Sequence, residues 1–138
     1  MLVEEIHSVV VATVDEMGHP HTAVMDMMWE DGKTVYFLTA DFKPLYKRLK
    51  EDGRVALTGM TQGAGTMDLK SISLTGQVEW IGKEHLGELL DANLYMYEIY
   101  PTEEGRSHLQ VFRFKKALGD FYDLTQLPLY QARFEIEG

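Results

Sequence analysis

The sequence contains no cysteine, which excludes disulfides, thiol catalysis, iron–sulfur ligation and cysteine-based zinc sites. It also lacks the run of about 18 or more apolar residues that a membrane-spanning helix needs, so no membrane partner is expected. The first eight residues, MLVEEIHS, carry two acidic residues and no basic region before a long apolar run, unlike a secretory signal peptide. We therefore expect a cytoplasmic protein.

Basic residues are scarce. Thirteen Lys and Arg stand against 22 Asp and Glu, for a formal net charge of -9. Nucleic-acid binding needs an extended positive surface that neutralises many phosphates, so no nucleic-acid partner is expected. This acidic balance still permits one small phosphate in one local positive pocket.

The length and composition are those of an ordinary globular domain. With 138 residues, 45% of them hydrophobic and 25% charged, the chain is expected to form one domain over residues 1–138. There is no internal repeat, low-complexity segment or linker. The core is large enough to form without disulfides or structural metals.

The first third of the chain predicts three strands joined by short turns. Ser8–Asp15 is rich in β-branched residues and predicts a buried strand. His21–Trp29 predicts a second strand, and the turn EDGK leads from it into a third, TVYFLT. We interpret this opening as a three-stranded meander.

The rest of the chain predicts helices between further strands. A helix is expected after Asp41, with Asp41 as N-cap, Pro44 in its first turn and Gly53 at its C-terminal cap. Leu45 and Leu49, four residues apart on this helix, are expected to face the core. The other elements are a strand over 54–60, a long strand over 69–81 bent at Gly76, a helix over 83–101, a strand over 109–125 and a loosely specified end, 131–138. Many short strands with two helices predict a mainly-β or α+β fold, an antiparallel barrel carrying helices.

The segment Val35–Gly59 collects five of the thirteen basic residues, Lys43, Lys47, Arg48, Lys50 and Arg54. Taken alone, this spacing is typical of a solvated basic helix face. The helix, however, begins directly after a strand, and the first N–H groups of a helix attract anions. A hydroxyl from Thr39 and an ammonium from Lys43 complete a candidate phosphate site.

The second strand carries three methionines in the sequence AVMDMMW. Methionine is polarizable and makes favourable contacts with aromatic faces, so a flat aromatic ligand could lie along this strand. The simpler alternative is that these methionines fill gaps in the core.

The order of three motifs resembles the pyridoxamine 5′-phosphate oxidase-like, FMN-binding split-barrel superfamily. The motifs are ATVDxxGxPH, YFLTxxxKxxxxxL and RVALT, followed by SISLTGQVEWI. The similarity covers Val9–Ile81 well and continues loosely to Thr125. It implies an antiparallel split β-barrel with two or three flanking helices, and a homodimer that binds FMN at the subunit interface.

The resemblance also implies which residues hold the cofactor. The second strand would line the isoalloxazine ring, and the strand-end threonine and the first lysine of the helix would hold the phosphate. A polar residue at the start of the long strand would reach the flavin from the partner subunit. These roles fall on Ala23, Val24, Met25, Asp26 and Met28, then on Thr39 and Lys43, and last on Lys70 or Ser71.

Two departures argue against the oxidase activity itself. The oxidase has a basic residue at the end of its second strand, where this chain has Met28, and it ends in an Arg-x-His segment, where this chain ends QARFEIEG. We therefore expect the fold and the FMN cofactor, with an unknown small-molecule substrate or electron donor. No catalytic side chain is identified.

Several alternatives remain open at this level. The chain could be a flavin-dependent oxidoreductase, including one that uses a deazaflavin, or a non-catalytic FMN- or haem-binding carrier, sensor or stress-response protein, or a cofactor-free interaction domain. His19 and His21 would share one strand face but have no third ligand nearby, so no metal site is expected. Tyr95, Tyr97 and Tyr100 predict a helix core or a dimer contact, or a lid over the flavin.

Overall fold

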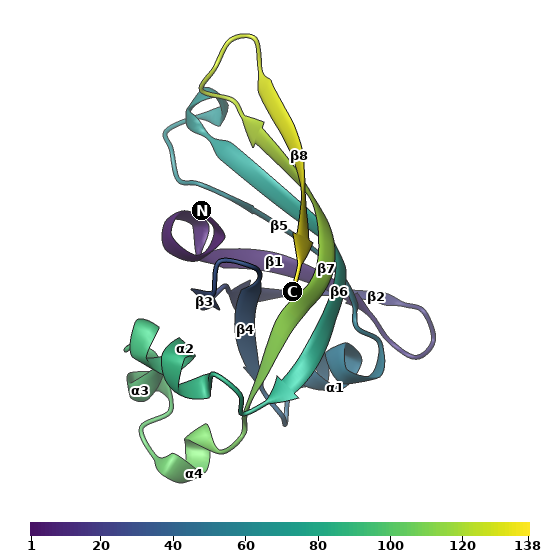
Figure 1. Ribbon diagram of the computed structural model, residues 1–138, viewed down its shortest axis with the longest axis vertical. Coiled ribbons are helices and arrows are strands. Elements are labelled where there is room, and N and C mark those ends of the chain that lie inside the picture. Colours follow the sequence, from purple (N-terminus) through teal and green to yellow (C-terminus); the bar gives the residue numbers. More distant parts are fainter.

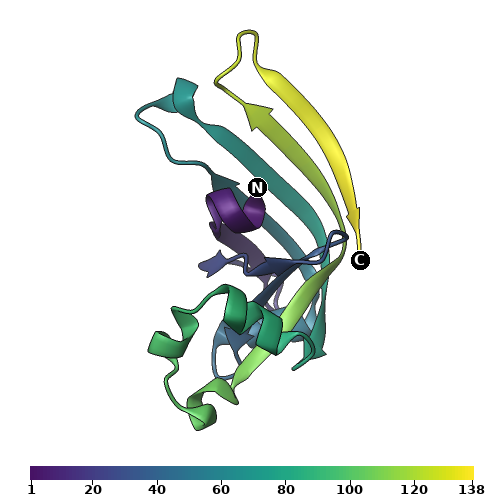
Figure 2. The ribbon, with the colours of Figure 1, turned by 60° about the vertical axis from the view of Figure 1, so that its left-hand side comes forward.

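The computed structural model describes residues 1–138, and its strands form one antiparallel sheet. The order in the sheet is β2-β1-β5-β6-β7-β4-β3, and β8 pairs with β7. The sheet curls into an open half-barrel (Figures 1 and 2), which confirms the expected split-barrel fold. The strands are β1 (Ser8–Val14), β2 (Pro20–Asp26), β3 (Trp29–Glu30), β4 (Val35–Ala40), β5 (Arg54–Met60), β6 (Lys70–Gly82), β7 (Leu109–Asp123) and β8 (Tyr130–Glu137).

Short helices occupy the connections between the strands. In Figure 1 the helices α2 to α4 lie together at one end of the molecule, on the connection from β6 to β7, and α1 lies beside that end of the sheet. No helix is long and apolar enough to cross a membrane. The helices are η1 (Leu2–Ile6), α1 (Pro44–Glu51), η2 (Thr66–Asp68), α2 (Leu86–Ala92), α3 (Met96–Ile99) and α4 (Glu103–Arg106).

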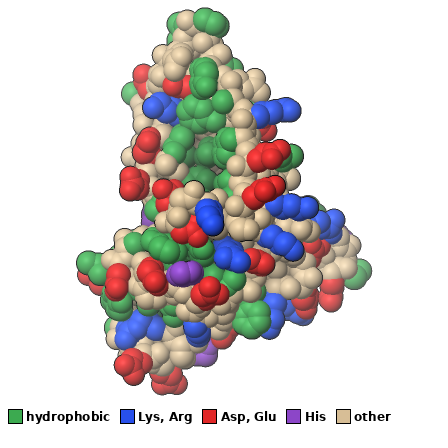
Figure 3. Space-filling model, viewed as in Figure 1, with side chains coloured by type: hydrophobic (Ala, Val, Ile, Leu, Met, Phe, Trp, Pro, Cys, Tyr) green, Lys and Arg blue, Asp and Glu red, His purple; other side chains and the backbone are tan.

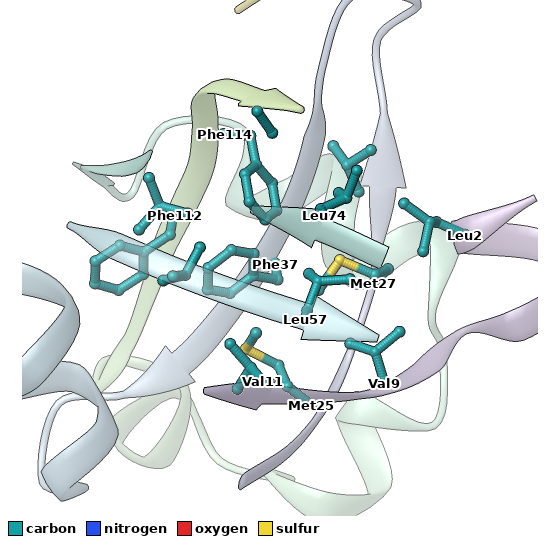
Figure 4. Packing of buried hydrophobic residues seen from close by; sticks show 14 of the residues in the cluster. Leu2, Val9, Val11, Met25, Met27, Phe37, Leu57, Leu74, Phe112 and Phe114 are labelled. Carbon is teal, nitrogen blue, oxygen red and sulfur yellow. The ribbon is translucent and has the colours of Figure 1, made fainter. Parts of the chain in front are cut away.

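The main core fills the inside of the curled sheet. Alternate residues of β1 and β5 point into it, as the period of two in a strand requires. Figure 4 shows the centre of this core, where the rings of Phe37 and Phe112 stack with their centroids 5.7 Å apart. Burying each such side chain contributes about 1.5–3 kcal/mol, so this cluster is a principal source of stability.

Strand β4 is buried along its whole length, and it separates two cores. Val35 and Phe37 point into the main core, whereas Tyr36, Leu38 and Ala40 point to a second cluster against α2 and α3. A strand covered on both faces has a continuous apolar sequence, as in VYFLTA. In the upper part of the face seen in Figure 3, around β5–β8, apolar side chains run down the middle and charged groups lie at the margins.

The second strand is shorter than predicted. It ends at Asp26, the last residue that pairs with β1. The next two residues are buried in different cores, Met27 at 0% exposure in the main core and Met28 at 4% in the second cluster. Here the Met27 N–H donates to the His7 carbonyl at 2.7 Å and the Met28 N–H donates to the Tyr36 carbonyl at 2.9 Å.

The predicted meander is only partly correct. Across the predicted turn, Trp29 at the end of the second predicted strand pairs with Tyr36, so β3 and β4 form the expected hairpin. The earlier part of the second predicted strand is β2, which pairs with β1 alone, while β4 pairs with β7 and β3. Between Asp26 and Trp29 the chain therefore passes from one end of the strand order to the other, and the result is an opening between β2 and β4.

The helix predicted over 83–101 is broken into α2 and α3. Asn93 ends α2, and its buried amide donates to the carbonyls of Met28 and Leu89, both at 2.8 Å. This side chain satisfies the carbonyl of Met28, which lies just beyond the end of β2. The break therefore brings α3 against β2, a tertiary contact that helical periodicity does not show.

The caps predicted for α1 are also wrong, although Leu45 and Leu49 are buried as expected. The N-cap is Lys43, because the Asp41 carboxylate instead accepts a hydrogen bond from His108 Nδ1 at 2.9 Å. The C-cap is Asp52, in an extended conformation. Gly53 is required for close packing, since a Cβ there would collide with the carbonyl of Val78.

The end of the chain is more ordered in the sheet than its sequence suggested. β8 pairs with β7 continuously from Tyr130–Asp123 to Glu137–Lys116. In β6 the expected bend appears as a register irregularity between Gln77 and Val78, immediately after Gly76. A Cβ at Gly76 would collide with the backbone of β7 at Lys116 and Ala117, so only glycine fits there.

We predict that Gly76→Ala lowers the free energy of unfolding by about 1–3 kcal/mol, because the added methyl group forces β6 and β7 apart. Gly87→Ala in α2 is the control, since a Cβ there meets nothing within 4 Å. It should change stability by no more than about 0.5 kcal/mol. Urea unfolding measures both, and equal stability of the two variants would contradict the close approach at Gly76.

The turn before β4 is organised by one carboxylate. Asp31 accepts hydrogen bonds from the Tyr36 hydroxyl at 2.6 Å and from the amides of Lys33 and Thr34 at 2.9 Å. The bond from Tyr36, helped by the two amides, lowers the pKa of Asp31 to about 2 although desolvation opposes this. A lowered pKa stabilises the fold above the ordinary value of about 3.9, and this contribution is lost as the pH falls towards 2.

We therefore predict that Asp31→Asn destabilises the protein at pH 6, and that the difference from wild type shrinks between about pH 4 and pH 2. Urea unfolding across this pH range measures the difference. Tyr36→Phe removes the strongest donor to Asp31 and should weaken the same pH dependence. A difference that stays constant from pH 6 to pH 2 would show that Asp31 has an ordinary pKa.

Candidate functional site

The opening between β2 and β4 leaves one edge of the sheet without a neighbouring strand. The two strands are linked where the Met28 N–H donates to the Tyr36 carbonyl. Beyond this point they separate, and β2 pairs only with β1. Backbone donors and acceptors on a free strand edge can pair with a ligand as well as with another strand.

A cavity of about 200 Å³ lies at this separation. Its walls come from β2, β4, the start of α1 and the end of α3. Nine of the twelve residues around it are hydrophobic, and a mainly apolar wall with a few polar groups is typical of a small-molecule site. The lining residues are Val24, Met25, Asp26, Met28, Leu38, Thr39, Ala40, Lys43, Leu45, Met96, Ile99 and Tyr100.

The structure brings six of the nine predicted site residues to this cavity, namely Val24, Met25, Asp26, Met28, Thr39 and Lys43. Ala23 is on the same strand but packs against the main core. Lys70 and Ser71 lie elsewhere, at the start of β6, where they pair with Asp123 and Tyr122. Within one chain these two residues are not part of the cavity.

The remaining six lining residues were not predicted. Leu45 was predicted only to face the core, Leu38 belongs to the predicted third strand without a role of its own, and Ala40 follows directly after that strand. Ile99 and Tyr100 come from the helical region whose tyrosines allowed a lid as one alternative. Their position depends on the break at Asn93, which turns α3 towards β2.

One end of the cavity is suited to an anion. Thr39 is 5% exposed at the end of β4, and Lys43 is exposed at the N-cap of the eight-residue helix α1. The first turn of α1 contains no acidic residue, so its positive dipole end is not neutralised there. A hydroxyl, an ammonium group and the start of a helix thus meet at one point.

The other basic residues of this segment have different contacts. The Lys50 ammonium lies 4.3 Å from the ring centre of Trp80, Arg54 binds Asp52 at 2.6 Å, and Arg48 Nε donates to the Thr13 hydroxyl at 2.7 Å. Lys43 is thus the one basic residue that lines the cavity. The basic segment is not a single functional face.

The other polar end of the cavity is built around Asp26. Its carboxylate accepts hydrogen bonds from the Ser8 hydroxyl at 2.6 Å and the Tyr95 hydroxyl at 2.7 Å, and His7 Nε2 lies 3.3 Å away. Burial would raise the pKa of Asp26, but these bonds outweigh it and lower the pKa below its usual value. Burial and the bond to Asp26 raise the pKa of Tyr95, which remains a phenol.

A family model described as pyridoxamine 5′-phosphate oxidase matches residues 1–121. The chain belongs to this family. A search of the curated proteins returned no match. The family match covers every strand of the cavity, and it stops within β7.

Solved structures of other proteins share the fold of this pyridoxamine 5′-phosphate oxidase family member. A NimC/NimA family protein from Clostridium acetobutylicum is 21% identical, with a TM-score of 0.78 over 97% of this chain and 87% of that one. A heme binding protein from Mycobacterium smegmatis is 14% identical, with a TM-score of 0.72 over 95% of this chain and about half (54%) of that one. An FAD-binding protein from Mesorhizobium loti is 14% identical, with a TM-score of 0.66 over 86% and 87% of the two chains. At these identities the similarity shows the fold.

The two departures from the oxidase pattern have clear positions in this family member. Met28, where the oxidase has a basic residue, is 4% exposed and lines the cavity with an apolar side chain. Arg133, in the C-terminal segment, binds Asp120 of the neighbouring strand at 3.0 Å. Neither position offers a free cation to a second phosphate at the cavity.

The paired histidines of the β1–β2 turn contact a carboxylate. His21 Nε2 lies 2.8 Å and His19 Nδ1 3.7 Å from Asp15 Oδ2. The hydrogen bond from His21, with those from the backbone, lowers the pKa of Asp15 to about 2. No group of three or more histidine, aspartate or glutamate side chains is arranged to hold a metal ion.

Proposed function

We propose that this chain is an FMN-binding flavoprotein, with the flavin ring along β2 and its phosphate at Thr39 and Lys43. The supporting observation is that residues from β2, β4 and α1, distant in sequence, line one cavity with an anion-binding end. The free edge of β2 offers backbone hydrogen bonds to the polar edge of a flavin. Met25 and Met28 offer soft contacts to its aromatic face.

The size and openness of the cavity support a homodimer with the cofactor at the subunit interface. Ligand pockets usually measure about 300–1,000 Å³, and the cavity of one chain is about 200 Å³. Two apolar residues of its wall remain open to solvent, Val24 at 73% and Ile99 at 59% exposure. A second copy of the chain would cover these residues and enclose the rest of the ligand, and Lys70 or Ser71 of that copy is our candidate for the covering contact.

Haem is the weaker candidate for this cavity, although one structural neighbour is described as a heme binding protein. Haem iron is generally held by a histidine, cysteine, methionine or tyrosine side chain. No histidine lines the cavity, and the nearby His7 already has partners at both ring nitrogens. The three methionines of the lining are only 4–6% exposed, which leaves Tyr100 as the one half-buried side chain of a suitable type. The apolar strand edge and the phosphate end fit a flavin better.

We further propose that the protein is a flavin-dependent oxidoreductase acting on an unknown small substrate. When bound, the flavin would supply hydride or electron transfer. The protein's own groups position the ligand: Thr39 and Lys43 hold its anionic end, and the free backbone edge of β2 orients its ring. The apolar wall from α3 excludes water from one side.

The first test is a visible absorption spectrum after FMN is added and the excess removed by gel filtration. We expect a flavin spectrum that elutes with a dimer, at one FMN per chain. FAD and riboflavin, titrated in parallel, test whether the single phosphate sets the affinity. A protein that retains no flavin would exclude this function, and a haem-type band after incubation with hemin would favour the carrier alternative.

We predict that Lys43→Ala weakens FMN binding by about 1.5–3 kcal/mol, or 10- to 150-fold, because it removes a charge-assisted contact to the phosphate. Lys50→Ala removes the same charge from the same helix, but Lys50 lies over Trp80. Its effect should be less than threefold, or about 0.6 kcal/mol. Fluorescence quenching of FMN measures both affinities, and equal losses would place the phosphate elsewhere.

A further inference from the structure

His7, Tyr95 and Asp26 form a continuous chain of hydrogen bonds that ends at the cavity. The ring of His7 contacts the Val3 carbonyl through Nδ1 at 3.2 Å and the Tyr95 hydroxyl through Nε2 at 2.7 Å. Tyr95 in turn contacts Asp26 Oδ2 at 2.7 Å, and Asp26 lines the cavity. The side chain of His7 is 29% exposed, so this series of hydrogen bonds connects solvent with the cavity.

The three hydrogen bonds of His7 and Tyr95 require three protons. A neutral histidine, a tyrosine and an aspartate carboxylate carry only two between them. A carbonyl can only accept, so Nδ1 of His7 must carry a proton towards Val3. The tyrosine has one proton, and it is needed for the contact with Asp26. The contact between His7 Nε2 and Tyr95 therefore needs a further proton, which makes the set an imidazolium and a carboxylate joined by a phenol.

The surroundings of Asp26 favour this distribution of charge. Its two oxygens already accept hydrogen bonds from the hydroxyls of Ser8 and Tyr95, contacts that favour a carboxylate, so the additional proton belongs on the histidine. The ionisable groups in contact with His7 are Asp26 from β2 and Tyr95 at the N-cap of α3, and its own helix η1 contributes only a backbone carbonyl. His7 also adopts a positive φ of 61°, which non-glycine residues rarely do, and the contacts at both ring nitrogens keep its side chain in place.

We propose that His7, Tyr95 and Asp26 form a proton relay to the cavity, with Asp26 as the group that exchanges a proton with the bound ligand. This inference rests on the proposed function only for the identity of the ligand. A flavin fits, because its ring becomes more basic as it accepts electrons. The apolar wall keeps water away from one side of the cavity, and the relay supplies protons to the ligand from solvent.

The proton transfer is balanced within the three side chains. The Nε2–H proton of His7 passes to the Tyr95 oxygen while the Tyr95 proton passes to Asp26 Oδ2. An imidazolium and a carboxylate become a neutral imidazole and a carboxylic acid, with no change in net charge. Asp26 then donates this proton to the ligand and is a carboxylate again, and solvent reprotonates His7.

The first experiment examines the ligand-free protein, so it does not depend on flavin binding. Nitrogen-15 NMR at pH 7.5 should show protons on both ring nitrogens of His7 in the wild type, and only one in Asp26→Asn. Asp91→Asn is the matched control, since Asp91 accepts a hydrogen bond from the surface Tyr97 at 3.1 Å. A neutral His7 in the wild type, or a doubly protonated one in Asp26→Asn, would overturn the proposal.

The second experiment follows the FMN-loaded protein during reduction by dithionite in a stopped-flow instrument. Tyr95→Phe keeps the ring but removes the short path through the hydroxyl and leaves only the longer direct contact of His7 Nε2 with Asp26 at 3.3 Å. Reduction should therefore slow by about 100-fold and lose its solvent deuterium isotope effect. Tyr97→Phe should behave as wild type. Unchanged rates in Tyr95→Phe would overturn the relay. A wild type that retains no FMN would overturn the proposed function instead, and the NMR experiment would then decide whether His7 carries the additional proton.

Discussion

The organisation of this protein depends on the separation of β2 from β4. Both strands belong to the same sheet, but they lie at different ends of its strand order and are joined directly at the hydrogen bond between Met28 and Tyr36. β4 pairs with β7 on one edge and with β3 on the other, so it does not pair with β2 and the sheet stays open there. A free strand edge and a cavity follow from this connectivity.

The helical region between β6 and β7 turns this opening into a bounded site. Asn93 satisfies the carbonyl of Met28 and ends α2, so that α3 covers the opening from one side. Tyr95, at the start of α3, reaches Asp26 on β2. The same contacts thus close the second core and place polar groups at the cavity.

The two polar ends of the cavity have opposite character. Thr39, Lys43 and the start of α1 form a positive end, whereas Asp26 forms a carboxylate end, with the hydroxyls of Ser8 and Tyr95 and the ring of His7 around it. Lys43 and Asp26 belong to different elements, which only the fold brings to one cavity. A ligand with an anionic group at one end and a ring of changing basicity at the other matches this arrangement.

Predictions that rest on short-range sequence patterns were more often correct than predictions that depend on contacts between distant elements. The strands at Ser8–Val14 and Arg54–Met60, and the burial of Leu45 and Leu49, were predictable, because period-two alternation and helix starts are short-range properties. Thr39 and Lys43 line one cavity, as their place at a strand–helix junction suggested, and their binding of a phosphate stays a prediction. The single helix over 83–101 and the caps at Asp41 and Gly53 were wrong, and the meander was correct only at its second turn. In each case a contact from a distant element, such as Asn93 to Met28 or His108 to Asp41, outweighed the local preference.

By itself the sequence determined the class of fold, the absence of thiol chemistry and the residue types of the anion-binding end, since these depend on composition and on neighbours along the chain. The tertiary structure alone decided which strand edge stays open, which basic residue of the segment lines the cavity, and that His7 and Tyr95 meet Asp26. Those three residues span 88 positions from His7 to Tyr95. Only the folding of the whole chain brings groups so far apart within hydrogen-bonding distance.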